Sequence, residues 1–467
     1  MRSNPSYSKQ ELQEQISDSN SELMMSLAEQ YSDQSIVSSK ISRIKEMLSC
    51  SELAASTETH IARCPGRISL SKHADYINND LLYLLDDRDI FVTAQKNDKN
   101  KLVLVNLKAE FENIELDLDA EADPSKWYFY PAKLYQALAQ DSQGLTLVYS
   151  SDLPEAAGLS SSHALMLSTY IAIDTSLRGA KATWQSSPET RIQNKAKLTE
   201  IIELLQSIEH ARGFKSGLGD QSAQLFGRKD QFCFIKLKPE LQVEYQPIPD
   251  DFALITATSP ERADKNMPEF AAANENIKAY KSINNIAKEY GCDYLGDLIY
   301  NFSDKEIFDI LNNISDSKLR GLTLYGLGEA ARVKNLKSNL STGAIGTHLN
   351  LSQQAEQNFT RDGDQWRSLT DLESSSYELN PSKPLAEHSG IYRASTLIND
   401  QLQTFATSLK GVCGSSISGA GLGGSNNIIC RKPLAESLKS SLSKDFHLDQ
   451  KVEIHQSNSS NAAYVII

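Results

Sequence analysis

The chain has 467 residues, of which 40% are hydrophobic and 23% charged, so it is long enough for two to three domains and a large core. Its net charge of -13 argues against general nucleic-acid binding, which requires a basic surface. An acidic protein can still hold a small anion at a local nest or a helix terminus. No apolar run approaches the length that spans a bilayer, so we expect no membrane partner.

The N-terminal stretch and the cysteines indicate a cytoplasmic protein. The opening residues MRSNPSYSKQELQEQ contain no apolar segment after Arg2, which argues against a secretory signal. The cysteines show neither CxxC pairing nor metal-ligand spacing, so we expect reduced thiols. They are Cys50, Cys64, Cys233, Cys292, Cys413 and Cys430.

Hydrophobic periodicity predicts a polar helical leader, followed by mixed strands and helices. Residues 1–58 show helical spacing at Leu23–Leu27 and Ile41–Leu48. Residues 268–335 are rich in helical patterns, whereas 350–385 are polar and are predicted as loops and short helices. Strands are predicted at Leu102–Leu107, Leu145–Tyr149, Phe232–Leu237, Phe252–Thr258, Asn427–Cys430 and Ala462–Ile467, and helices at Ala164–Ile173, Leu198–Ile208, Leu322–Arg332 and Ala394–Leu409.

This order of elements indicates an α+β fold, because strands and helices mix without strict βαβ alternation. The linker-like stretch EYQPIPDDFALITA suggests a boundary near residue 245. We therefore expect a leader at 1–58, a first domain at 59–245 and a second domain at 246–467.

Two stretches have the composition of anion-binding sites. Gly414–Gly424 reads GSSISGAGLGG beside an apolar strand, where dense glycine allows sharp turns or close approach of backbone. Leu145–Leu167 contains a strand, a turn and three serines (Ser160 to Ser162) that open an apolar helix. Such a helix start can bind phosphate, although an ordinary serine-capped helix has the same pattern. A Walker P-loop is excluded, because the GK[ST] ending is absent.

A third stretch connects these two. Ala62–Tyr76 reads ARCPGRISLSKHADY, and together with PEAAGLSSSHA and GSSISGAGLGG it resembles the three ordered motifs of the GHMP kinases, and within them the galactokinase family. Ser216–Leu237, with its GLGDQ, and Ile255–Glu275 are also similar to that family. The resemblance runs from about residue 60 to the C-terminus. It implies a two-lobed fold, with a mixed-sheet N-terminal lobe, a ferredoxin-like C-terminal lobe and the active site between them.

The resemblance also implies an activity, namely an ATP-dependent kinase that phosphorylates the anomeric hydroxyl of galactose or a galactose-like monosaccharide. ATP and Mg²⁺ would be its cofactors, and a monomer or weak homodimer is expected. The nucleotide phosphates would bind at the second motif, at Gly158, Leu159, Ser160, Ser161 and Ser162.

Asp220 and Arg67 match the family's catalytic residues. A carboxylate within reach of a sugar hydroxyl can orient it and accept its proton. An arginine can stabilise the charge on the transferring phosphoryl group and favour ionisation of the aspartate. Without the resemblance, Asp220 is also compatible with a turn residue, and Arg67 with a surface salt bridge.

The resemblance further implies a metal site and a sugar site. Glu209 and Ser162 would bind Mg²⁺, which prefers one or two protein oxygens together with phosphates and water. Glu209 is equally compatible with an exposed helix residue. The sugar would contact His73, Asp75, Tyr76 and Gly217, while Gly419, Gly421, Gly423 and Gly424 would shape the pocket.

The first motif departs from the family where the sugar is recognised. Ser71-Lys72 stands in place of three residues that usually include Gly-Glu, and Ser69 replaces the usual Asn. His163 takes a position usually held by Ala. Lys72 could pair with the carboxylate of a uronic acid, point to solvent or pair with Asp75. We therefore expect phosphoryl transfer to be retained, with specificity for galactose in question.

Two other functions remain open. A non-catalytic sugar or ATP sensor on the same fold is favoured by the altered sugar motif and disfavoured by the presence of Asp220 and Arg67. A GHMP enzyme for isoprenoid alcohols or homoserine is disfavoured by HADY and GDQ, which are details of sugar kinases.

Overall fold

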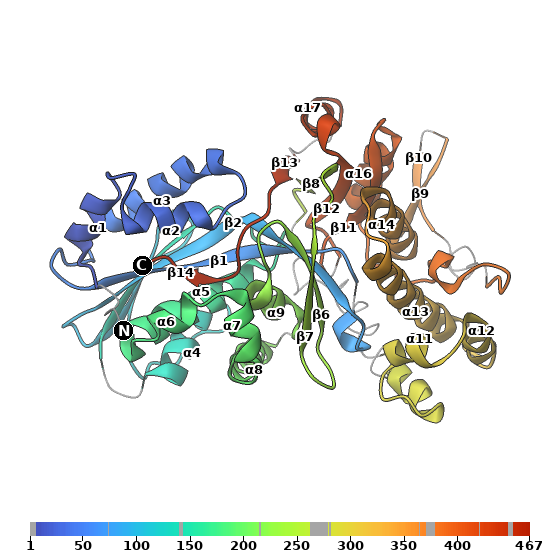
Figure 1. The fold of residues 1–467 in the computed structure, drawn as a ribbon, viewed down its shortest axis with the longest axis horizontal. Coiled ribbons are helices and arrows are strands. Elements are labelled where there is room, and N and C mark those ends of the chain that lie inside the picture. The colour runs from blue at the N-terminus through green and yellow to red at the C-terminus, as the bar shows by residue number, and fades with distance from the viewer. Residues whose placement is uncertain are drawn as a thin grey trace.

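In the computed structural model, the described residues form two large β-sheets with their helices and a separate two-stranded sheet (Figure 1). The structure describes residues 6–72, 74–139, 143–213, 216–261, 279, 282–363, 365–369, 379–419, 421–446 and 452–467. Among these residues, no helix combines the length and the apolar character that crossing a membrane would require.

The larger sheet has eight strands and belongs mainly to the N-terminal lobe. Its order is β14-β1-β2-β5-β3-β4, with β6 paired to β2 and β7 to β6. The sheet is mixed, because β3 and β5 are parallel and the other pairs are antiparallel. The strands are β1 (Thr59–Ser69), β2 (Leu81–Lys96), β3 (Lys101–Asn106), β4 (Ile114–Asp117), β5 (Leu145–Ser151), β6 (Gln231–Lys236), β7 (Gln242–Pro247) and β14 (Tyr464–Val465).

Helices cover both faces of this sheet, as Figure 1 shows. Successive strand residues point to opposite faces, so Ile61 packs with the leader whereas Ala62 packs with the helices of the other face. The leader contributes α1 (Lys9–Gln15), α2 (Glu22–Glu29) and α3 (Val37–Ser49). The other helices of this lobe are α4 (Phe129–Leu138), α5 (Ser161–Arg178), α6 (Lys181–Trp184), α7 (Pro188–Gln193), α8 (Lys195–Ala211) and α9 (Gly219–Phe226).

The smaller sheet is antiparallel and forms the C-terminal lobe, in the order β11-β12-β8-β13. Its strands are β8 (Phe252–Thr258), β11 (Val412–Ile417), β12 (Ser425–Arg431) and β13 (Glu453–Ser457). Apolar side chains of α16 and α17 pack on β8 and β12. The helices of this lobe are α11 (Leu298–Asn301), α12 (Asp304–Asn312), α13 (Ser317–Ser338), α14 (Thr342–Glu356), α16 (Leu397–Ser408) and α17 (Ala435–Asp445).

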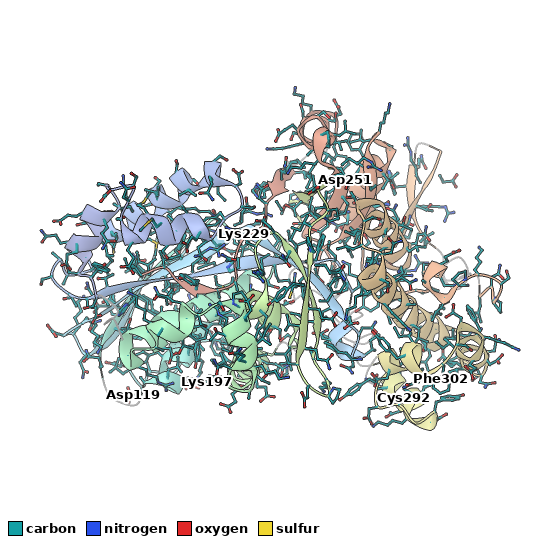
Figure 2. All side chains as sticks on the ribbon, viewed as in Figure 1. Asp119, Lys197, Lys229, Asp251, Cys292 and Phe302 are labelled. Atoms are coloured by element: carbon teal, nitrogen blue, oxygen red, sulfur yellow. The ribbon has the colours of Figure 1, made fainter. Side chains whose placement is uncertain are left out.

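Single side chains also connect distant segments. Lys229, labelled in Figure 2, donates from Nζ to the carbonyl of Glu29 at 2.8 Å and so ties α2 to the turn before β6. Asp251, also labelled there, lies just before β8 and accepts a hydrogen bond from Arg431 at 2.6 Å. Arg88 of β2 donates to the Thr256 hydroxyl of β8 at 2.8 Å, which joins the two lobes.

Most predicted elements are confirmed, and the exceptions are informative. Residues 350–385 contain a strand hairpin, β9 (Phe359–Asp362) and β10 (Gln365–Ser368), as well as the end of α14. The glycine stretch is not a loop throughout, because Gly414 to Ile417 lie in β11. The predicted boundary at 245 falls within β7, which belongs to the larger sheet, and β14 returns to that sheet from the far end of the chain.

Candidate active site

The site begins at an irregularity in β1, where the pairing with β2 shifts between Pro65 and Arg67. Gly66 occupies this bulge, and a Cβ there would lie 2.5 Å from the Leu153 side chain and 3.3 Å from the Leu159 carbonyl oxygen. Glycine therefore permits the second motif to approach the strand closely. The Arg67 amide donates to the Leu159 carbonyl at 3.1 Å.

The three sequence motifs meet at the carbonyl oxygen of Gly158. Arg67 of the first motif donates to this oxygen from its guanidinium at 2.7 Å, and the Ser418 hydroxyl of the third motif donates at 2.9 Å. Gly158 has φ +74°, and a Cβ there would lie 2.7 Å from the Ser418 carbonyl oxygen. Glycine is thus required both by the backbone conformation and by the contact between the two loops.

The third-motif glycines serve two purposes. Gly414 packs against α14, where a Cβ would lie 2.0 Å from the Gly346 carbonyl oxygen. Gly419 and Gly424 instead face the second motif, with a Cβ meeting Gly158 at 3.1 Å and Ala157 at 3.0 Å respectively. The stretch therefore holds the second motif in place by close backbone packing.

Asp220 lies in the first turn of α9 and forms an ion pair with Arg67, with 2.7 Å between Oδ1 and Nε. The Ser160 hydroxyl donates to the other carboxylate oxygen, Oδ2. Burial raises the pKa of Asp220, but the charges of Arg67 and His163 and these hydrogen bonds outweigh it and lower the pKa to about 2. About a quarter of the side chain (26%) remains exposed, so a ligand can reach this ionised carboxylate.

The start of α5 lies beside this pair. Ser160 has φ +60° and gives its hydroxyl to Asp220, so it does not cap α5 as serines at a helix start usually do. Ser161 and Ser162 begin the helix and are half-buried, whereas the Leu159 side chain is buried in the core. A helix start with no side-chain cap leaves backbone N–H groups and the positive end of the dipole for an anion.

The side chain of Glu209, in the last turn of α8, is fully buried. Its Oε2 is 2.8 Å from Nε2 of His163, and both side chains are buried. His163 Nδ1 faces Asp220 at 3.5 Å from Oδ2. Ser162, half-buried at the helix start, fits a magnesium ligand, whereas the buried Glu209 carboxylate is engaged by an imidazole and does not fit one in this arrangement.

Of the predicted sugar residues, Asp75 and Gly217 lie beside the start of α9, where a Cβ at Gly219 would be 3.5 Å from the Asp75 carboxylate. Asp75 rests on Gly217, where a Cβ would lie only 1.6 Å from the carboxylate. Tyr76 packs on the helices of the C-terminal lobe, and burial raises the pKa of its hydroxyl well above the usual value. His73 lies outside the described residues. The site also includes Tyr83 of β2, whose hydroxyl would be 2.4 Å from a Cβ at Gly219.

Lys72 points into the C-terminal lobe, which differs from all three alternatives that the sequence left open. Its side chain is 2% exposed, and Nζ donates to the carbonyl of Ile417 next to the glycine stretch. Its backbone amide donates to Glu329 at 3.3 Å. Burial lowers the pKa of Lys72 to about 8, against the opposing charges of Glu356 and Glu329. Lys72, one of the residues that differ from the family motif, thus connects the N-terminal lobe to Ile417 and Glu329 of the C-terminal lobe.

The geometry agrees with the comparisons to known proteins. A family model described as the GHMP kinases N terminal domain matches residues 129–228. The galactokinase of Saccharomyces cerevisiae is 25% identical over 65% of this chain and 62% of its own length. The galactokinase of Schizosaccharomyces pombe is 24% identical over 46% of this chain and 44% of its own length. The matched residues 129–228 are therefore similar to the N-terminal domain of the GHMP kinases.

Solved structures confirm the two-lobed GHMP kinase fold. The Lactococcus lactis galactokinase complexed with galactose matches 92% of this chain and 99% of its own, with a TM-score of 0.68 and 18% identity. The Methanococcus jannaschii mevalonate kinase matches 86% of this chain and 99% of its own, with a TM-score of 0.50 and 14% identity. By sequence, the chain spans less than two thirds of the length of the two curated galactokinases.

Sequence reasoning found most of this site and missed two parts of it. Tyr83 belongs to no motif and looks like an ordinary strand residue in LLYLL. His163 was visible as a departure from the family, but its contact with Glu209 depends on how α5 and α8 pack. The only sequence signal for this contact is an ionisable residue at a position of the second motif where the family usually has Ala.

Proposed function

We propose that this protein is an ATP-dependent sugar kinase that phosphorylates the anomeric hydroxyl of galactose or a galactose-like monosaccharide. The observation that carries this proposal is the ion pair of Arg67 and Asp220, which is partly exposed beside the uncapped start of α5. The names of the curated relatives and of the galactose-bound structural neighbour support the choice of sugar.

In this reaction Asp220 orients the sugar hydroxyl and accepts its proton. With a pKa of about 2, the carboxylate is ionised at neutral pH and is held by Arg67 and Ser160. Phosphoryl transfer depends mainly on positioning and on stabilising charge, because its transition state is loose. Arg67 supplies a fixed positive charge next to the reacting atoms.

The nucleotide phosphates bind at the start of α5, where the backbone of Ser161 and Ser162 provides N–H donors. Mg²⁺ would be held by the Ser162 hydroxyl together with phosphate oxygens and water, and when bound it neutralises phosphate charge. The first and third motifs keep this helix start in place, because Arg67 and Ser418 both donate to the Gly158 carbonyl.

The sugar lies against Asp75, Tyr76 and Gly217, with Tyr83 at the edge of the same site. Sugar recognition needs such a set of donors and acceptors, because unmatched polar groups are costly when buried. Lys72 makes no direct contribution in this proposal, since its amine is bound to Ile417. We further propose a cytoplasmic monomer or weak homodimer.

The proposal is tested by measuring ADP release from Mg-ATP with a panel of sugars. The panel contains galactose, arabinose, fucose, glucuronic acid and galacturonic acid. We expect turnover with galactose or a neutral relative and little with the two acids. Absence of turnover on every sugar, with tight binding of sugar or ATP retained, would instead establish the non-catalytic sensor.

A further inference from the structure

His163 lies where three helices of the active site meet. It belongs to the first turn of α5, Glu209 to the last turn of α8 and Asp220 to the first turn of α9. The imidazole is 2% exposed, and its nitrogens Nε2 and Nδ1 lie 2.8 Å from a Glu209 oxygen and 3.5 Å from an Asp220 oxygen. The three side chains therefore form a continuous row from the protein interior to the catalytic carboxylate.

The two contacts have different strengths. The Glu209 contact is within hydrogen-bond distance and is fully buried, with Glu209 at 0% exposure. A buried carboxylate is costly unless it is paired, so the nearby imidazole stabilises Glu209 at this position. The Asp220 contact is longer and lies next to the exposed part of the site. His163 is thus the third side chain beside the Asp220 carboxylate, in addition to Arg67 at Oδ1 and Ser160 at Oδ2.

We propose that His163 is a positioning residue for Asp220, and that Glu209 orients His163 instead of binding the metal. This inference rests on the proposed kinase reaction. It explains why an ionisable residue stands at the start of α5 without facing solvent. It also leaves Ser162, phosphate oxygens and water as the metal ligands, in line with the preference of Mg²⁺ for few protein ligands and several waters.

Two substitutions separate the contacts of the imidazole. The amide nitrogen of His163→Asn can take the position of Nδ1 and donate to Asp220, whereas that of His163→Gln can take the position of Nε2 and donate to Glu209. We expect kcat to fall about 10- to 100-fold in His163→Ala and His163→Gln, with the KM for ATP and sugar nearly unchanged. His163→Asn should retain several times more activity than His163→Gln.

A purely structural role makes the opposite prediction. If His163 serves only to satisfy the buried Glu209, His163→Gln should be the better replacement in both folding stability and kcat. That result, or a wild-type kcat in His163→Ala, would overturn the inference. Urea unfolding of each variant identifies losses that come from misfolding, and if His163→Ala fails to fold, the comparison of Asn with Gln still decides.

The role of Glu209 is tested by metal binding, independently of turnover. Free Mn²⁺ is measured by electron paramagnetic resonance in the presence of the enzyme and a non-hydrolysable ATP analogue. We expect Glu209→Gln and the exposed control Glu203→Gln to bind Mn²⁺ within about twofold of the wild type. A loss of about tenfold or more in Glu209→Gln alone is typical of a lost ligand and would contradict the inference. If the wild type shows no turnover, the proposed function is refuted. The Mn²⁺-binding comparison of Glu209→Gln with Glu203→Gln would still show whether Glu209 is a metal ligand.

Discussion

Strand β1 carries two arginines, Arg63 and Arg67, and each forms an ion pair with an aspartate. The Nε–Oδ distance is 2.7 Å in both, from Arg63 to Asp89 and from Arg67 to Asp220. The first pair has no exposed surface, whereas the Asp220 side chain is 26% exposed. Two pairs of the same chemistry on one strand therefore have different surroundings.

The leader accounts for the difference. Lys40 and Arg43 of α3 also bind Asp89, at 3.3 and 2.8 Å, and the Tyr31 hydroxyl donates to it at 2.5 Å. Together these leader side chains cover Asp89 and exclude solvent from its carboxylate. Around Asp220 the chain supplies Arg67 and Ser160 instead, and the carboxylate side chain keeps 26% of its surface exposed. The two ion pairs have equal N–O distances, so solvent exposure distinguishes the pair that we propose to be catalytic from the buried pair.

The largest effect is expected from Asp220→Ala. Loss of the acceptor for the sugar proton should lower kcat about 10³- to 10⁴-fold, which is within the range for a general base together with lost orientation. ATP binding should persist, because the phosphate site at α5 remains. Single-turnover ADP release measures the loss of catalysis, and a nucleotide-binding assay measures the retained affinity for ATP. Wild-type activity in this variant would remove Asp220 from the mechanism.

Asp89→Asn should show the opposite profile. It leaves the cations of Arg63, Lys40 and Arg43 without their shared carboxylate, which we expect to cost about 3–5 kcal/mol of unfolding free energy. Activity per folded molecule should stay close to that of the wild type. Urea unfolding and active-site titration measure these quantities, and the exposed Asp119→Asn serves as control. A stability equal to that of the control would show that the buried cluster contributes little.

Lys72 extends the comparison to a buried cation that binds a carbonyl. Its pKa of about 8 lies below the usual value of 10.5, so the unfolded chain binds more protons than the folded one between these pH values. Stability should therefore rise with pH in this window. We expect the unfolding free energy of the wild type, relative to Lys72→Met, to increase by about 2 kcal/mol from pH 7.5 to 9.5. A flat difference would mean that the amine is well solvated.

The smallest effect is expected from Ser418→Ala. The Gly158 carbonyl loses one of its two donors and keeps Arg67. A neutral hydrogen bond contributes about 1 kcal/mol, so kcat/KM for ATP should fall a few-fold. Ser437→Ala, exposed on α17, is the control. A loss beyond a hundredfold would indicate that Ser418 contacts the phosphates directly.

Sequence reasoning singled out Arg67 and Asp220, the pair that we propose to be catalytic, but gave no indication of the buried pair of Arg63 and Asp89. The three motifs and the GDQ segment located Arg67, Asp220 and the start of α5, because each has a distinctive local composition. Asp86 to Asp89 read as DDRD, which resembles a polar turn, yet these residues lie buried within β2. Their partners come from distant parts of the chain, for example Lys40 and His455.

The same limit applies to Lys72 and to the hairpin of β9 and β10. The sequence showed that Lys72 departs from the family but not which way the amine points, since Ile417 is 345 residues away. The polar hairpin has no apolar alternation that would distinguish it from a loop. Local composition therefore indicated which residues form the candidate site, while long-range packing decided the surroundings of each charged group.

Strand β1 receives one of its neighbours from the far end of the chain. The carbonyl of Asn461 accepts a hydrogen bond from Arg63, 398 residues away, and β14 pairs with Ala62 and Arg63. During synthesis the ribosome must therefore release nearly the entire C-terminal lobe before this side of β1 is covered. The strand that carries Arg67 is among the first to emerge and among the last to be completed, so a nascent chain halted near residue 250 should expose an unpaired sheet edge to chaperones.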